Sequence, residues 1–201
     1  MSRMRDLPSI VVNANIFRMS SSSPAWTKRF AATLPWVAAV GLMWIYWSPL
    51  WQGGGLIGGD TYPYFMPQKA FYADEMRAGR IPLWNPLVGH GYPQLAESQT
   101  GVLYPPNLWL YGNLSLNRAY VLSQMLHYVL AYLTTWLLAR RLGITRWGAA
   151  FASLVFVYSW FPARICVEWA IIGGAYVPLL LWCVESYLQR THVVYLWLLS
   201  G

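Results

Sequence analysis

Apolar residues in this chain gather into long blocks without Asp, Glu, Lys or Arg, separated by shorter polar segments. The blocks at 31–51 and 119–139 are long enough, at about 1.5 Å of rise per residue, to cross a hydrocarbon core of about 30 Å as helices. The blocks at 147–163 and 169–184 are shorter and need their charged flanks close to the membrane interfaces. The pattern predicts an all-α integral membrane protein, a polytopic helical bundle of about four spans.

A fifth apolar block begins at 193 and reaches the last residue, Gly201. Backbone groups left unpaired in lipid cost several kcal/mol each, so a natural chain is not expected to stop at that depth. The block is therefore interpreted as a truncated fifth span, and the chain as the N-terminal part of a longer protein. Residues 118–201 would then hold spans two to four and the start of the fifth.

The distribution of Lys and Arg predicts which side of the membrane each loop occupies. With the N-terminus inside, the inner side collects Arg3, Arg5, Arg18, Lys28, Arg29, Arg140, Arg141, Arg146 and Arg190, and the outer side keeps only Lys69, Arg77, Arg80, Arg118 and Arg164. This topology makes residues 1–30 a cytoplasmic tail, makes 31–51 an uncleaved membrane anchor, and places the 52–117 loop outside.

Composition agrees with lipid as the main solvent. Charged residues are 10% of the chain, against roughly 25% in an ordinary soluble domain. The net charge of +7 falls mostly on the cytoplasmic flanks, near anionic lipid headgroups, so no nucleic-acid partner is expected. The expected partner is the lipid bilayer.

The 52–117 loop is rich in both proline and aromatic residues, so a folded segment on the membrane surface is expected rather than a linker. Residues 67–79 predict one short helix with proline at its start and glycine just past its end. On that helix Tyr72 is expected to face the membrane or core, and Lys69, Asp74 and Arg77 to face water. The segments RIPLWNP and LYPPN are expected to form turns and extended pieces.

Asp60 is the first candidate for chemistry, because it follows a glycine-rich run at the outer end of the first span, where a substrate could approach closely. The structural alternative is a solvated aspartate that caps the next turn. Within the second span, Ser123, Gln124 and His127 share one helical face, for which interhelical hydrogen bonding is the favoured use over catalysis.

Basic residues of the outer side could bind an anionic lipid headgroup or phosphate: Lys69, Arg77, Arg80 and Arg164. Arg164 could equally form an ion pair with Glu168, and His90 is a glycine-flanked loop histidine that could bind substrate or be structural. The chain has no phosphate loop, zinc-type cysteine spacing or haem motif, so neither a metal site nor a cofactor is predicted. Cys166 and Cys183 are expected to be small buried hydrophobes.

Residues 58–109 resemble the bacterial YfhO family of membrane proteins. The shared pattern is GD, then F-x-P, G-x-x-P-L-W-N-P, G-x-P and Q-x-G-x-x-Y-P, present here as GGDTYPYFMP, GRIPLWNP, GYP and QTGVLYP. A looser likeness extends over roughly residues 55–200. The family is similar to the polytopic GT-C glycosyltransferases, in which a sugar leaves a polyprenyl-phosphate carrier at the outer membrane face.

The resemblance implies that Asp60, by its position in the first external loop, is the catalytic residue. It further implies a polyprenyl-phosphate-linked sugar as donor, an envelope glycan or polymer as acceptor, and a multi-pass location in the bacterial plasma membrane. Many relatives carry a second acid where this chain has Thr61. The alternatives are a non-catalytic lipid-carrier transporter or envelope-assembly scaffold, or an inactive fragment.

Overall fold

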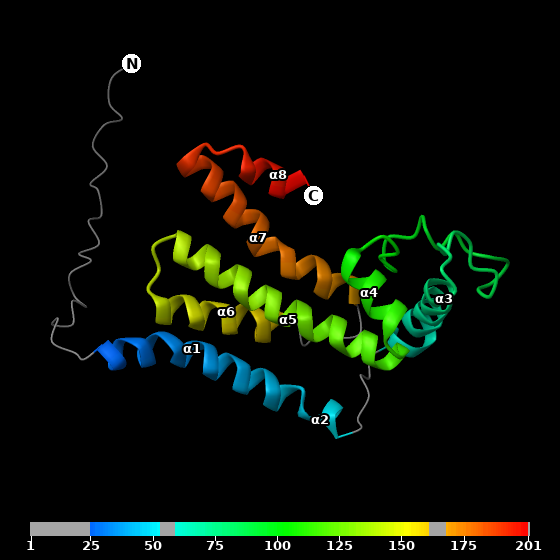
Figure 1. The fold of residues 1–201 in the computed structure, drawn as a ribbon, viewed down its shortest axis with the longest axis horizontal. Coiled ribbons are helices and arrows are strands. Elements are labelled where there is room, and N and C mark those ends of the chain that lie inside the picture. Colours follow the sequence, from blue (N-terminus) through cyan, green and yellow to red (C-terminus); the bar gives the residue numbers. More distant parts are fainter. Residues whose placement is uncertain (1–24, 53–58, 161–167, 201) are drawn as a thin grey trace, which may run out of the picture. The chain divides into compact units, whose positions relative to one another are not determined.

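The computed structural model describes residues 25–52, 59–160 and 168–200, and within these ranges the protein is helical with no strand. The elements are α1 (Ala25–Tyr46), α2 (Ser48–Trp51), the π-helical turn η1 (Thr61–Phe65), α3 (Met66–Arg77), α4 (Pro105–Asn113), α5 (Leu116–Arg141), α6 (Arg146–Trp160), α7 (Glu168–Arg190) and α8 (Val194–Ser200) (Figure 1). The chain divides into two compact units, Met1–Leu34 and Pro35–Gly201. Of the first unit, the structure describes only the beginning of α1, Ala25–Leu34.

In the second unit, α5 packs along both α6 and α7. Small residues allow the close approach of α5 and α7: Ala131 and Ala175 are fully buried, and the Thr134 hydroxyl donates to the Ala175 carbonyl oxygen at 3.1 Å. The turn between α5 and α6 passes through Gly143, whose φ of 84° suits glycine. This short connection makes α5 and α6 adjacent neighbours along the chain.

Within the described ranges, two helices are long and apolar enough to cross a membrane, Leu116–Arg141 and Glu168–Arg190. They contain the predicted second and fourth blocks. The first block is divided between α1, with Pro35 inside it, and the short α2, while the third block coincides with the 15-residue α6 up to Trp160 and continues into residues outside the described ranges. The all-helical class is confirmed, and the apolar helices suggest membrane association.

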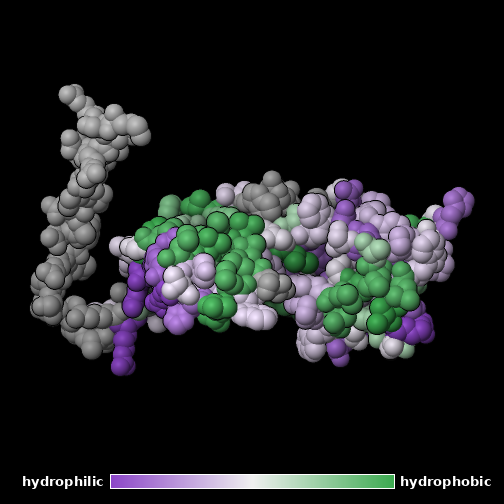
Figure 2. Space-filling model, turned by 90° about the horizontal axis from the view of Figure 1, so that it is seen from above, coloured by the Kyte–Doolittle hydropathy of each residue, from purple (hydrophilic) through white to green (hydrophobic). Residues whose placement is uncertain are grey.

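Hydrophobic side chains are widely exposed on these helices. On α7, for example, Val177, Leu181 and Leu188 are 48%, 53% and 68% exposed. Figure 2 shows hydrophobic residues, in green, gathered into broad patches on the face that it draws. Apolar surface of this extent marks contact with lipid or with another protein.

The segment between α2 and α5 folds around α3 and α4. Helix α3 follows the prediction, with Pro67 in its first turn and Gly79, at φ 70°, just beyond its end. The expectation of turns and extended chain at LYPPN was wrong, since Pro105 and Pro106 open helix α4. Proline needs no amide hydrogen in the first turn of a helix, while Tyr104 before it is extended at φ −69° and ψ 117°.

Candidate functional site

Asp60 lies directly before η1 and is exposed. Its backbone carbonyl oxygen accepts the amide hydrogens of Tyr64 and Phe65 at 3.1 and 3.0 Å, but its carboxylate makes no capping hydrogen bond to the turn. The predicted alternative, a side-chain cap, is therefore not what the structure shows. Thr61, the next residue, is fully buried.

Among the acidic residues that the structure describes, Asp60 is the one whose carboxylate has no hydrogen bond or ion pair. The others are all engaged: Asp74 with Arg77, Glu75 with Arg80, Glu97 with the amide hydrogens of Gln99 and Thr100, Glu168 with Lys69, and Glu185 with Gln189. The Asp60 carboxylate is therefore open to solvent and to a ligand that approaches this turn.

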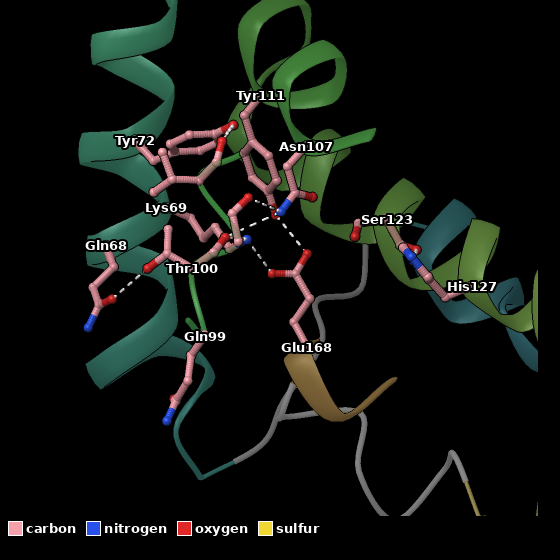
Figure 3. Close-up of polar contacts among 12 residues, drawn as sticks. Gln68, Lys69, Tyr72, Gln99, Thr100, Asn107, Tyr111, Ser123, His127 and Glu168 are labelled. Atoms are coloured by element: carbon pink, nitrogen blue, oxygen red, sulfur yellow. Dashed lines mark hydrogen bonds and ion pairs between the residues drawn. The ribbon is translucent and has the colours of Figure 1, made fainter. Parts of the chain in front are cut away.

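A buried ion pair joins α3 to the first residue of α7. The Lys69 ammonium lies 2.6 Å from a Glu168 carboxylate oxygen, and the two side chains are 1% and 0% exposed. Lys69 also donates to the Thr100 carbonyl oxygen at 2.8 Å, and the Tyr111 hydroxyl donates to the other Glu168 oxygen at 3.0 Å (Figure 3). A buried ion pair needs such additional hydrogen bonds to offset its desolvation.

Aromatic rings complete the surroundings of this pair. The Lys69 nitrogen lies 4.7 Å from the ring centre of Tyr111, within cation–π range. Burial and the negative charge of Glu168 raise the pKa of Tyr72 to about 12 and hold the pKa of Tyr111 well above its usual range. The Tyr111 phenol therefore stays protonated and remains a donor to Glu168.

The prediction that Lys69 faces water was wrong. The helix containing Lys69 does not lie alone on a surface but is covered by the loop at Thr100 and by the start of α7, both remote in sequence. Lys69 is consequently out of reach of an external phosphate, and Glu168 has Lys69 as its partner.

An amide network surrounds Thr100. The Gln94 side chain donates to the Thr100 hydroxyl at 3.0 Å, and the Thr100 hydroxyl lies 3.0 Å from the Gln68 side-chain oxygen. Asn85 of the PLWNP motif is fully buried and donates to Gln94 at 3.2 Å, while its side-chain oxygen accepts the Leu87 amide hydrogen at 2.9 Å. The predicted turn at Asn85 is confirmed, and the motif contributes to the packing of the loop.

A pocket of about 310 Å³ opens beside the ion pair, between the 98–104 segment and the start of α7. Tyr104 in its wall joins a chain of hydrogen bonds, with its hydroxyl 2.7 Å from both His127 Nε2 and the Tyr176 hydroxyl. His127 Nδ1 faces the Ser123 carbonyl oxygen at 2.6 Å, so Nδ1 carries the hydrogen and Nε2 of the neutral ring accepts from Tyr104. His127 therefore bonds a residue outside its own helix, as expected, whereas the buried side chains of Ser123 and Gln124, for which the same was expected, have no hydrogen-bond partner among the described residues.

Two further residues predicted to bind substrate, Arg80 and His90, lie on the surface. Arg80 is exposed and makes a two-pronged ion pair with Glu75, at 2.9 and 2.6 Å. His90 is exposed between Gly89 and Gly91, both at positive φ. Arg164 and Cys166 lie outside the described residues, and Cys183 is buried within α7.

The Glu75–Arg80 pair is expected to persist at neutral pH. The hydrogen bond from Arg80 lowers the pKa of Glu75, so the interaction is fully formed above the ordinary glutamate pKa and is lost only as pH falls through the lowered value. An NMR titration of the Glu75 carboxyl carbon, with the signal assigned by its loss in Glu75→Gln, would measure the pKa of Glu75. A midpoint at or above 4.5 would contradict the pair.

No group of three or more His, Cys, Asp or Glu residues is arranged to hold a metal ion in the described part of the chain. The polar residues that sequence reasoning missed are Thr100, Gln94 and Tyr111, together with the pairing of Glu168. A glutamate at the start of an apolar block was the available signal, since a carboxylate there needs a partner.

No family model, curated protein or solved structure matches this chain. The function is therefore argued from the geometry around Asp60, the buried ion pair and the adjacent pocket, together with the motifs of the 58–109 segment.

Proposed function

We propose that this chain is a polytopic membrane protein, with α1, α5, α6 and α7 as spans, a cytoplasmic N-terminus and an extracytoplasmic 52–117 loop in the bacterial plasma membrane. In the most apolar 18-residue stretch of each helix, the buried share is 39% for α5 and 33% for α7. These low shares support contact with lipid, because the core helix of a soluble protein would be mostly buried. Exposed Val37, Val40 and Ile45 on α1 support the same assignment.

The proposed activity is transfer of a sugar from a polyprenyl-phosphate carrier to an extracytoplasmic envelope glycan or polymer. The observation that supports it is the Asp60 carboxylate, exposed and without a partner while every other described carboxylate has one. The likeness of residues 58–109 to the YfhO pattern supports the class of reaction.

In this reaction Asp60 acts as the general base. It accepts the proton of the acceptor hydroxyl as that oxygen forms a bond to the anomeric carbon of the sugar, and the carrier phosphate leaves with the electrons of the broken bond. Lys69 takes no part in binding the phosphate, because Glu168 and Thr100 already occupy it. Arg80 would have to exchange its contact with Glu75 for the phosphate, and His90 is exposed.

Asp60→Asn is expected to lower transfer by about 100-fold or more, because a general base commonly contributes a factor of that order. The assay uses membranes containing the chain, radiolabelled undecaprenyl-phosphate glucose or N-acetylglucosamine, and envelope polymer as acceptor. Asp74→Asn is the matched control, since Asp74 is an exposed aspartate of the same loop whose partner is Arg77. Transfer by Asp60→Asn at the wild-type rate, with equal expression, would favour the non-catalytic scaffold instead.

A further inference from the structure

The pocket beside the ion pair has two walls of different origin. One wall comes from the loop, with Ser98, Gln99 and Gly101 leading to Tyr104. The other comes from α7, where Trp169, Ile172 and Gly173 lie three and four positions apart and so share one face of the helix. A volume of about 310 Å³ is at the lower end of the range for small-molecule sites.

We infer that this pocket binds the neutral, hydroxyl-bearing ring of a sugar, an inference that rests on the proposed transferase function and names the subsite for its glycosyl group. Among the described residues, no charged side chain lines the pocket, which argues against a phosphate as its occupant. The half-exposed indole of Trp169 offers a flat apolar face for the C–H side of a pyranose ring. Such a pairing of one aromatic surface with a few polar groups is what an uncharged polyol requires.

Two polar side chains of the lining are free to meet ligand hydroxyls. Gln99 and Ser98 have no side-chain hydrogen bond within the described residues, and Gln99 points away from the buried cluster in Figure 3. The Gln99 amide can donate and accept, and the Ser98 hydroxyl can do the same. Tyr104 is different, because its hydroxyl is already engaged by His127 and Tyr176, so it contributes a fixed ring to the wall.

Lys69 holds the two walls together. Its ammonium binds the carbonyl oxygen of Thr100, which lies between Gln99 and Gly101, and the carboxylate of Glu168, which directly precedes Trp169. Asn107 adds a second tie to the loop by donating to the Thr100 and Gly101 carbonyl oxygens at 3.3 and 3.1 Å. The pocket is therefore preformed, which reduces the entropy lost when a ligand binds.

Gly173 provides a way to fill the pocket without disturbing the fold. A Cβ atom added at this position would meet no other atom within 4 Å, and the residue lies within helix α7. Leucine at this position projects a side chain into the pocket, and replacing a helical glycine removes a conformational penalty rather than adding one. Gly41→Leu is the matched control, since Gly41 is also helical, has the same free space and lies outside the pocket.

The test is saturation-transfer NMR on the chain in phospholipid nanodiscs, with methyl glycosides of glucose, galactose, mannose and N-acetylglucosamine as probes. At least one glycoside is expected to bind the wild type and Gly41→Leu with equal affinity. The same glycoside is expected to bind Gly173→Leu and Trp169→Ala at least tenfold more weakly. Binding by none of the four, equal binding by Gly173→Leu, or displacement of the glycoside by inorganic phosphate would overturn the inference.

Thermal unfolding of each variant is measured alongside, and Trp169→Ala decides the outcome if Gly173→Leu does not fold. The assay contains neither carrier nor acceptor, so this inference and the transferase proposal fail separately. Glycoside binding without Asp60-dependent transfer would support the sugar-binding pocket and contradict the transferase proposal. If transfer depends on Asp60 but glycoside binding does not depend on Gly173 and Trp169, the transferase proposal is supported and the sugar-binding pocket is contradicted.

Discussion

Glu168→Gln is expected to lower the free energy of unfolding by about 3–5 kcal/mol, the usual cost of removing one partner from a buried ion pair. The substitution keeps the shape of the side chain but leaves the Lys69 ammonium, 1% exposed, without a countercharge. Loss of the tie between α3 and α7 should also separate the two pocket walls. Far-UV circular dichroism during unfolding of detergent-solubilised protein by sodium dodecyl sulfate would measure the change.

Glu185→Gln is the matched control on the same helix. The Glu185 carboxylate accepts a hydrogen bond from Gln189 in an exposed position, so its replacement is expected to cost less than about 1 kcal/mol. The double variant Lys69→Met/Glu168→Leu should recover most of the stability that Glu168→Gln loses, because neither charge remains buried. Equal decreases in the free energy of unfolding for Glu168→Gln and Glu185→Gln would show that the ion pair is not what joins the loop to α7.

Asn85→Leu is expected to destabilise the loop by about 2 kcal/mol, because it leaves buried polar groups without partners. The Asn85 side chain is 0% exposed and bonds both the Gln94 oxygen and the Leu87 amide hydrogen. Loss of the Asn85–Gln94 hydrogen bond should also weaken the hydrogen bond that Gln94 donates to the Thr100 hydroxyl. Amide hydrogen exchange at Thr100 and Tyr92 would report the loosening, since Asn85 and Tyr92 also exchange backbone hydrogen bonds.

Asn113→Leu is the control for that experiment. Asn113 is exposed, and its side chain donates only to the Trp109 carbonyl oxygen of the same helix, so a change within about 0.5 kcal/mol is expected. Faster exchange at Thr100 in both variants would point to a general effect of lost asparagines. Unchanged exchange in Asn85→Leu would mean that the PLWNP turn is held by its backbone bridge alone.

Local sequence signals predicted the helices well. Charge-free blocks anticipated α5 and α7, and proline and glycine marked the two ends of α3, because these features act over a few residues and depend little on distant parts of the chain. The wrong prediction at Pro105–Pro106 also has a local cause, because two prolines are compatible with both an extended segment and the first turn of a helix.

Pattern alone could not assign partners to the polar residues. Lys69 and Glu168 are nearly a hundred positions apart, and nothing in either surrounding segment indicates that they meet. Amphipathic spacing placed Lys69 on a water-facing side of its helix, but the loop at Thr100 and the start of α7 cover that side. Asp60 was recognisable from its glycine-rich setting. That its carboxylate, among those the structure describes, is the one without a partner is a property of the fold.

By itself, the sequence predicted the all-helical class and the approximate positions of α3, α5 and α7, because hydrophobic periodicity and helix-ending residues are encoded locally. Only the tertiary structure decided which charges neutralise each other, which amides become buried, and where a pocket opens between the 98–104 segment and α7. Those outcomes depend on the burial of groups brought together from distant segments, and in a low-dielectric interior such burial decides whether a charge is free to act or is held by a partner.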